Sequence, residues 1–438
     1  MVESLFRIPN ISWAGVRFEP PLPVDGADGL AAALAGLNGR FSLALRGPQD
    51  RLILARDRLG LNKLFFALGA DGTATAANYL ADLVDRGIPF EAIYSVPAGH
   101  VLEIDLRRRT LVLRRFFDVD AVARADTLPL EVEARRIRRH LELWFARLAN
   151  RFGGRRICVC LSGGLDSSLI AALAARHFAD VAAYTYGYAD APESEDMRSA
   201  RRVAEALGLR LRRVPATARD VLDVLDDALC YGQDWRAFNV HCAIVNELLA
   251  RAIARDARGA AGQPAPLALT GDLMNEILAD YVPLSHAGRD IYTLPRVGAA
   301  RLRAALLRGL DAGDREVGIF GHHGIEVVQP YGLVLDQLLP LPASFLGGEG
   351  AKQRLARAMA GDLLPAFVFA RTKARAQVGD ARGPGGIVST LEAAGRDARW
   401  LRGAFCRRFG IEEEGSLDGF IRVGRYRFPR EYPRTGKA

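Results

Sequence analysis

The feature that most constrains this chain is a short apolar run followed at once by a loop of glycine and serine. Ile157–Leu161 is typical of a buried strand, and Asp166–His177 is typical of a helix. The residues between them are Ser162-Gly163-Gly164-Leu165. Glycines let the backbone approach an anion, and free N–H groups at a helix start point toward it. The pattern therefore predicts a phosphate-binding loop within a fold of alternating strands and helices.

A plainer interpretation of the same loop is a serine-glycine turn that caps a helix, with Asp166 as the capping residue. The pattern G-x-x-x-x-G-K-[ST] is absent, which excludes a kinase-type loop. S-G-G-x-D-S directly after a buried strand is more specific than a lone pair of glycines. We therefore favour phosphate binding.

Two domains are expected from 438 residues. In the first hundred residues, Phe41–Leu45 and Arg51–Ala55 flank a turn, which predicts antiparallel hairpins in an α+β domain. Leu130–Phe152 has helical periodicity, and strands and helices alternate from Ile157, which indicates parallel βαβ units. We place the boundary between residues 125 and 126, so that residues 126–438 form an α/β domain with a helical C-terminal part.

The formal charge of +8 raises the question of nucleic-acid binding. The basic residues are scattered, however, and aromatic residues are not interleaved with them. No stretch approaches the roughly 18 apolar residues of a membrane helix, and no signal peptide is evident. The five cysteines show no metal-binding spacing, which fits a reducing compartment. We expect a cytoplasmic protein with no nucleic-acid or membrane partner.

Several motifs resemble those of one enzyme family. The loop Ser162–Ser167 is similar to the pyrophosphate loop of the ATP pyrophosphatases, which cleave ATP between its α and β phosphates. Other stretches resemble the asparagine synthetases and the related β-lactam synthetases, and these are Glu195–Gly208, Thr270-Gly271-Asp272-Leu273-Met274-Asn275-Glu276 with Tyr281, Gly324–Tyr331 and Arg371-Thr372-Lys373. The resemblance runs from about Ile157 to Val378 and implies a parallel-sheet ATP pyrophosphatase fold.

The resemblance implies two cofactors, ATP and Mg²⁺. The residues implied in nucleotide binding are Leu161, Ser162, Gly163, Gly164, Asp166, Ser167, Ser168 and Gly271. Mg²⁺ would be held by Asp166 and by position 275, where the family has aspartate and this chain has Asn275. A neutral amide binds Mg²⁺ more weakly than a carboxylate, and Asp272 or Glu276 could compensate.

The candidate catalytic residues are Asp272, Lys373 and Glu276. The resemblance places Asp272 where the family orients or deprotonates the attacking nitrogen, although it could simply shape a turn. Lys373 would neutralise the developing oxyanion or the leaving AMP. Its position is notable because the chain has only four lysines, which are Lys63, Lys352, Lys373 and Lys437.

Other polar residues lie near the expected substrate pocket but match no motif. We interpret most of them as ordinary buried or surface groups, and these are Asp234, His241, His322 and His323. Glu326 has two open interpretations, as part of the pocket or as one half of a structural ion pair.

The first domain resembles the second half of the family's glutaminase, an Ntn-hydrolase-like domain. The matching stretches are Leu37–Leu45, Leu54–Gly60 and Val96–His100. Those glutaminases use an N-terminal cysteine whose own α-amino group acts as the base. Here Val2 follows Met1, and no cysteine precedes Cys158. We therefore expect a truncated glutaminase-like domain, residues 1–125, that does not hydrolyse glutamine.

These observations predict an ATP-dependent amide-forming ligase. The enzyme would adenylate a small-molecule carboxylate and release pyrophosphate, after which an amine would displace AMP to give an amide or a lactam. We expect a natural-product pathway, such as antibiotic biosynthesis, and leave open whether the protein forms a homodimer. Two alternatives stay open, namely a superfamily enzyme that acts on a nucleotide or tRNA, and a nucleotide-binding pseudoenzyme, which the irregular Leu273-Met274-Asn275 suggests.

Overall fold

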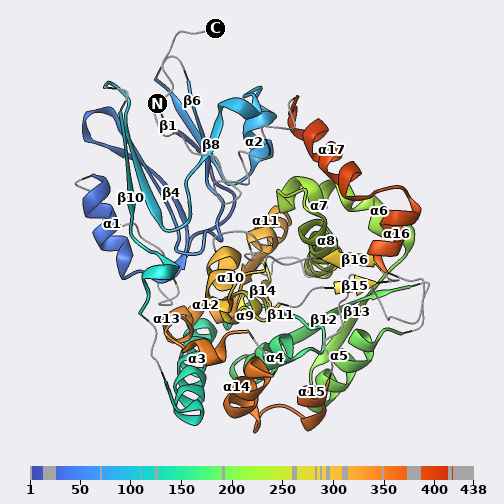
Figure 1. Ribbon diagram of the computed structural model, residues 1–438. Helices are drawn as coiled ribbons and strands as arrows, with labels where there is room; N and C mark the ends of the chain where they lie inside the picture. The colour runs from blue at the N-terminus through green and yellow to red at the C-terminus, as the bar shows by residue number, and fades with distance from the viewer. Residues whose placement is uncertain are drawn as a thin grey trace.

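The computed structural model describes residues 2–12, 26–69, 72–108, 110–123, 127–189, 193–258, 264–281, 284–286, 289–292, 296–307, 314–347, 350–371, 386–412 and 417. Two β-sheets of the N-terminal part lie beside a larger α/β part (Figure 1). The predicted boundary between residues 125 and 126 falls outside the described residues.

The N-terminal part contains two four-stranded sheets. The first has the order β1 (Val2–Leu5), β7 (Ala74–Ala77), β6 (Phe65–Leu68) and β8 (Ile93–Ser95). The second has the order β10 (Thr110–Arg115), β9 (His100–Asp105), β5 (Arg51–Arg56) and β4 (Ser42–Gly47). A short ladder joins β2 (Ile11–Ser12) to β3 (Gly39–Arg40). The predicted hairpin is confirmed, because β4 and β5 pair in antiparallel fashion around Pro48–Asp50.

Alternation of side chains along the strands gives each face of the second sheet its own core. Leu54 and Leu102 from this sheet pack in one cluster with Phe66 and Ala76 from the first sheet. The other face is covered by α1 (Ala27–Ala35), whose buried leucines join a separate cluster. The N-terminal part is therefore a sandwich of two sheets with a helix on one outer face, an α+β arrangement as predicted.

The C-terminal part is built on a five-stranded parallel sheet. Its order is β13 (Arg210–Ala216), β12 (Val181–Tyr188), β11 (Ile157–Cys160), β14 (Leu267–Leu269) and β17 (Glu326–Val328). The chain moves outward from β11 in one direction and then returns to its other side at β14. Open parallel sheets bind their ligands outside the carboxyl ends of the strands at such a switch point.

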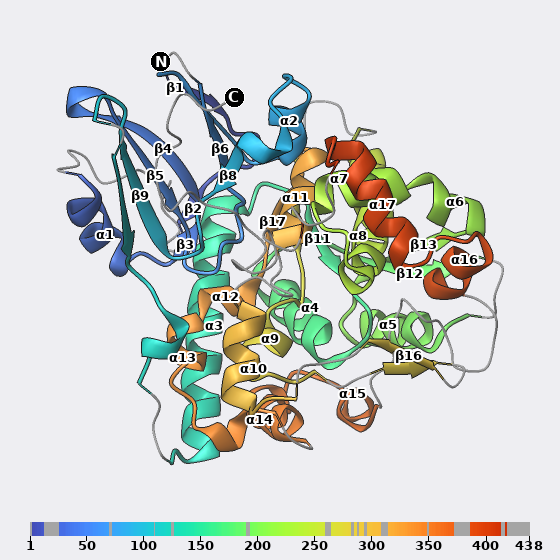
Figure 2. The same ribbon diagram turned by 45° about the horizontal axis from the view of Figure 1, so that its top comes forward.

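Helices cover both faces of this sheet (Figures 1 and 2). One face carries α3 (Leu130–Phe152), α4 (Leu165–His177), α5 (Glu195–Ala206) and α14 (Ala351–Ala360). The other carries α7 (Leu225–Gly232), α8 (Ala237–Arg258) and α11 (Asp314–His322). The remaining elements are α2 (Leu80–Val84), η2 (Phe90–Ala92), η3 (Val119–Ala121), α6 (Ala218–Asp223), α9 (Met274–Leu278), the β15 (Leu284–His286) and β16 (Arg289–Tyr292) ladder, α10 (Ala299–Ala305), α12 (Pro330–Leu333), α13 (Leu335–Leu338), η5 (Ala343–Phe345), α15 (Ala366–Ala370), α16 (Ile387–Ala393) and α17 (Ala398–Phe409).

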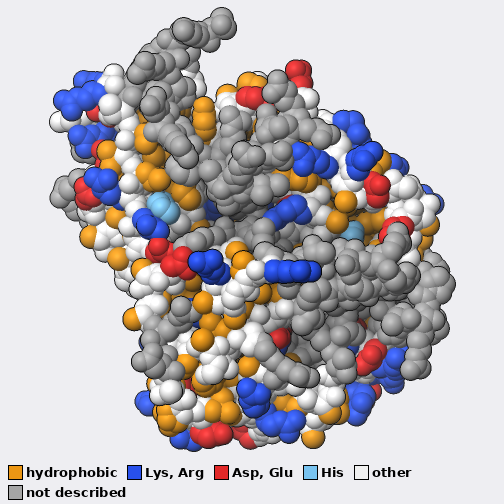
Figure 3. Space-filling model, viewed as in Figure 1, with side chains coloured by type: hydrophobic (Ala, Val, Ile, Leu, Met, Phe, Trp, Pro, Cys, Tyr) orange, Lys and Arg blue, Asp and Glu red, His pale blue; other side chains and the backbone are white. Residues whose placement is uncertain are grey.

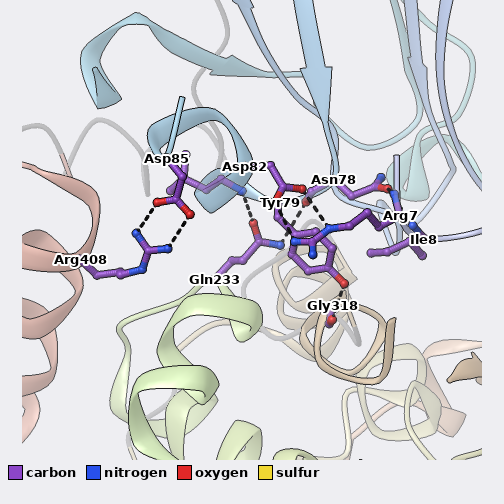
Figure 4. A network of polar contacts seen from close by, with 10 residues as sticks. Arg7, Ile8, Asn78, Tyr79, Asp82, Asp85, Gln233, Gly318 and Arg408 are labelled. Atoms are coloured by element: carbon purple, nitrogen blue, oxygen red, sulfur yellow. Dashed lines mark hydrogen bonds and ion pairs between the residues drawn. The ribbon is translucent and has the colours of Figure 1, made fainter. Parts of the chain in front are cut away.

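Buried hydrogen bonds join the N-terminal part to the α/β part (Figure 4). The Tyr79 hydroxyl donates to the Gly318 carbonyl at 2.7 Å. The Gln233 side chain accepts from the backbone N of Leu80 at 2.8 Å and donates to the Asn78 carbonyl at 3.2 Å. One hydrophobic cluster also includes residues of both parts. The N-terminal part therefore packs against the α/β part through buried hydrogen bonds and a shared hydrophobic core.

Candidate active site

The glycine-serine loop lies at the carboxyl end of β11, next to the switch point of the sheet. Gly163 has a φ of +70°, and a Cβ there would lie 2.3 Å from the backbone N of Ala200 in α5. Only glycine tolerates both the left-handed conformation and this close approach. The predicted order of strand, loop and helix is therefore confirmed, while phosphate binding by this loop stays a prediction.

Serine hydroxyls organise the loop from within. The hydroxyls of Ser162 and Ser167 lie 3.1 Å apart, and the backbone N of Ser162 donates to Ser167 Oγ at 3.2 Å. Ser168 Oγ is buried and has no hydrogen-bond partner among the described residues. Each hydroxyl can turn its hydrogen toward a new acceptor. The loop thus combines hydroxyl donors with the N–H groups at the start of α4, as an anion site requires.

The turn after β14 packs directly over the start of α4. A Cβ on Gly271 would lie 2.7 Å from the backbone N of Ser167 and 2.9 Å from the carbonyl carbon of Asp166. This close approach requires glycine and joins two predicted sites that are about a hundred residues apart in sequence. Leu273 in the same turn is buried and has a φ of +80°, a conformation that costs a non-glycine residue about 1–2 kcal/mol.

A buried lysine joins the loop to this turn. Lys352 Nζ on α14 lies 3.1 Å from Asp166 Oδ2, 2.6 Å from Asn275 Oδ1 and 2.9 Å from Asp280 Oδ2. Burial alone would lower the pKa of Lys352, but Asp166 and Asp280 outweigh it and hold that pKa above its usual value. Lys352 and Asp280 were not predicted as site residues, and the scarcity of lysine in the sequence was the only signal for Lys352.

The oxygens around Lys352 Nζ fit a divalent cation. They come from two carboxylates and one amide, and all lie within 3.1 Å of one point. The second oxygen of Asp166, Oδ1, is buried and has no hydrogen-bond partner in the described parts of the chain. Mg²⁺ prefers such oxygen ligands. The predicted pair Asp166 and Asn275 thus fits Mg²⁺ when Asp280 is added, although Mg²⁺ binding itself stays a prediction.

A cluster of carboxyl groups lies beyond the turn. Arg315 on α11 donates from Nη2 to Asp272 Oδ2 at 3.3 Å, and the Tyr281 hydroxyl donates to Glu276 Oε1 at 2.7 Å. Burial, aided by the charge of Asp272, raises the pKa of Glu276 to about 7 and raises that of Glu316 well above its usual value. The predicted residues Asp272 and Glu276 therefore share one electrostatic environment. Arg315 and Glu316 were not predicted as site residues, because they match no motif.

Arg371 brings the third predicted stretch to the loop. Its Nη1 donates to the carbonyl of Ser162 at 3.3 Å, and its Nη2 donates to Asp196 on α5. The end of α15 is thereby held beside the glycine-serine loop. Lys373 lies two residues further along, outside the described residues, so its catalytic role stays a prediction.

The remaining candidates have structural partners. His322 stacks on Tyr231 with ring centroids 3.4 Å apart, and His323 Nε2 lies 2.8 Å from Glu247 Oε1. Burial lowers the pKa of His241 to about 4. Asp234 forms an ion pair with Arg236 at 2.6 Å, and Glu326 forms one with Arg155 at 2.5 Å. No group of three or more His, Cys, Asp or Glu side chains that could hold a metal occurs among the described residues.

These features define a class, an α/β protein with a glycine-serine loop and a carboxyl cluster at the switch point of a parallel sheet. Comparison with known proteins agrees. Residues 149–311 match the asparagine synthase family model. The carboxyethyl-arginine β-lactam synthase of Streptomyces clavuligerus is 31% identical over 225 residues, which cover 49% of this chain and 41% of that protein.

Two asparagine synthetases extend the comparison. Asparagine synthetase [glutamine-hydrolyzing] 2 of Lotus japonicus is 26% identical over 261 residues, or 56% of this chain and 40% of that protein. Asparagine synthetase [glutamine-hydrolyzing] 1 of Saccharomyces cerevisiae is 28% identical over 286 residues, or 57% of this chain and 47% of that protein. The chain is similar to the asparagine synthase family model over residues 149–311 and to these three relatives over 49–57% of its own length. It spans less than half the length of these three relatives.

Proposed function

We propose that this chain is an ATP-dependent carbon–nitrogen ligase that forms AMP. The observation that carries the proposal is the contact between two predicted sites. The turn that contains Asp272 lies within 2.9 Å of the helix start that follows the nucleotide loop, as measured from a Cβ built on Gly271. A nucleotide on the loop and an acyl group beside Asp272 would therefore be neighbours.

The proposed reaction has two steps. A carboxylate oxygen of the substrate attacks the α-phosphorus of ATP, the bond to the β,γ unit breaks, and pyrophosphate leaves. An amine nitrogen then attacks the acyl carbon, and the carbon–oxygen bond to AMP breaks. The amine loses one proton in this step. Mg²⁺ on the polyphosphate would neutralise part of its charge.

The chain offers an acceptor for that proton. The Asp272 side chain is 30% exposed, so it can face a substrate, and the carboxyl groups of Glu276 and Glu316 lie behind it. A base works best when its pKa lies near the working pH, and the pKa of Glu276 is raised to about 7 by burial and by Asp272. We assign Asp272 as the group that accepts the proton of the amine, and Glu276 as a second group that could accept it. Lys373 is assigned to the oxyanion and the leaving AMP.

The nitrogen donor is a separate amine, free ammonia or a second group of the same molecule. Two relatives are named as glutamine-hydrolyzing and one as a β-lactam synthase. We infer a small-molecule amine or an intramolecular amine, in a natural-product pathway.

Two features bear on other partners. Lys and Arg side chains are spread over the face in Figure 3 with Asp and Glu among them, instead of forming one basic patch. On this face the distribution differs from the basic stripe or patch that is typical of a nucleic-acid-binding surface. In the part of the chain that the structure describes, no helix is long and apolar enough to cross a membrane.

Exchange between ATP and labelled pyrophosphate tests the proposal. We expect exchange to depend on one group of carboxylic acids from a panel of amino acids, dicarboxylic acids and N-acyl amino acids. Asp166→Ala is the matched variant, and we expect it to lose exchange while its circular dichroism is unchanged. ATP binding by calorimetry without exchange for any acid would instead indicate a nucleotide-binding protein that does not adenylate.

A further inference from the structure

The oxygens around Lys352 Nζ come from three places in the chain. Asp166 lies in the first turn of α4, Asn275 lies in α9, and Asp280 follows the end of α9. Their oxygens are 3.1, 2.6 and 2.9 Å from the same nitrogen. The Lys352 ammonium is the cation that these three oxygens hold in the structure, and Asp166 Oδ1, which is buried and has no hydrogen-bond partner among the described residues, is one further oxygen of the cluster.

The backbone fixes Asp280 relative to Asn275. The N–H of Asp280 donates to the Asn275 carbonyl at 2.9 Å, and the N–H of Ala279 donates to the Glu276 carbonyl at 3.3 Å. These two bonds form a Schellman motif, which reverses the chain at a helix end. Ala279 has the left-handed φ of +52° that this motif requires, a position where glycine is usual. Ala279 is also buried, so the surrounding structure holds it in this conformation and thereby fixes the position of Asp280 next to α9.

The position of Asp280 next to Asn275 affects the charge of the site. An amide at position 275 offers an oxygen but no negative charge, so Asp166 and Asn275 alone would give the site a single charge. Asp280 restores the second charge at nearly the same distance from the centre. A unit charge at this distance in a partly buried site changes the affinity for a divalent cation by about 10-fold or more.

We propose that Asp280 is the second carboxylate of the cation site and takes over the charge that position 275 lacks. The proposal rests on the proposed function only for the identity of the cation, Mg²⁺ with ATP. Lys352 lies at the centre of the site in the structure. It therefore competes with a divalent cation and must leave the centre when one binds.

Binding of Mn²⁺, a spectroscopic substitute for Mg²⁺, tests the proposal without any carboxylic acid substrate. Electron paramagnetic resonance would measure free Mn²⁺ with the wild type and its variants, with and without α,β-methylene-ATP. We expect Asp280→Asn to weaken Mn²⁺ binding about 10-fold or more. The exchanged pair Asn275→Asp with Asp280→Asn should bind Mn²⁺ close to the wild-type level, because it keeps both charges. Lys352→Met should strengthen binding without nucleotide.

Asp362→Asn is the matched control, since the Asp362 side chain is 71% exposed and pairs only weakly with Arg138 at 3.3 Å. It should bind Mn²⁺ like the wild type. Wild-type affinity in Asp280→Asn, or no recovery in the exchanged pair, would overturn the proposal. If Asp280→Asn does not fold, the exchanged pair decides the question alone. These outcomes do not depend on adenylation, so failure here and failure of the proposed function are distinguishable.

Discussion

Replacing Glu276 by glutamine should change how the stability of this protein depends on pH. Glu276 is buried, and burial together with the Asp272 charge raises its pKa to about 7 from the ordinary value of 4.5. Glutamine keeps the size and can still accept the bond from the Tyr281 hydroxyl, which is 2.7 Å long. The substitution therefore removes the titration with little change in packing.

The direction and size follow from proton binding. Below pH 4.5 the Glu276 carboxyl is protonated in both the folded and unfolded chains, and its shifted pKa has no effect. As the pH rises to 7, the unfolded chain releases this proton while the folded chain keeps it, so the wild type loses stability. The difference of pKa corresponds to about 3 kcal/mol in the free energy of unfolding. The loss is complete slightly above pH 7.

Urea denaturation at pH 4.5 and pH 8 would measure this effect. The free energy of unfolding of Glu276→Gln minus that of the wild type should grow by about 3 kcal/mol between the two values. Titrating groups that do not interact with Glu276 cancel in this difference. Glu131→Gln, at the exposed start of α3, should show no such growth. An equal difference at both pH values for Glu276→Gln would refute a raised pKa and the assignment of Glu276 as a second proton acceptor.

Three further predictions concern catalysis and binding. Lys373→Ala should lower turnover by about 10²–10³-fold, and Lys373→Arg should not restore it, because a planar guanidinium cannot take the place of a compact ammonium. Steady-state turnover beside nucleotide affinity by calorimetry would check this, and full activity of the arginine variant would contradict it. Gly271→Ala should abolish nucleotide binding, because its Cβ would lie 2.7 Å from the backbone N of Ser167. Calorimetry decides that case, with Gly36→Ala as the control variant, because Gly36 has a φ of −88° and an added Cβ would meet no neighbour within 4 Å. Glutamine as sole nitrogen donor should yield no glutamate, and release above the buffer rate after repeated purification would show otherwise.

Much of the fold could be predicted because its signals are local. The periodic apolar residues of Leu130–Phe152 match α3 from end to end. The apolar run Ile157–Leu161 exceeds β11 by one residue, although Leu161 still donates its N–H to the carbonyl of Tyr184 in β12. Glycines near the ends of the predicted strands indicated the positions of the glycine-serine loop and of the turn after β14. These elements depend on neighbours in sequence, which a single chain displays directly.

The parts of the site that escaped prediction depend on contacts between distant residues. Lys352 reaches Asp166 across 186 positions of sequence, and nothing in its own helix indicates this. Asp280 reaches the same point only because Ala279 adopts a left-handed conformation, and an alanine in a sequence does not indicate this conformation. Arg315 and Glu316 likewise gain their importance from the approach of α11 to the turn after β14.

Transfer of ¹⁸O from the substrate tests the central claim most directly. For an acid that supports pyrophosphate exchange, both carboxylate oxygens would be labelled, and the products of complete turnover with ATP and an amine would be separated for mass spectrometry. Adenylation requires one labelled oxygen in each AMP, none in pyrophosphate, and the other in the amide. ADP with the label in inorganic phosphate would contradict the account, because the carboxylate would then have attacked the γ-phosphorus and the site would not form an acyl-adenylate.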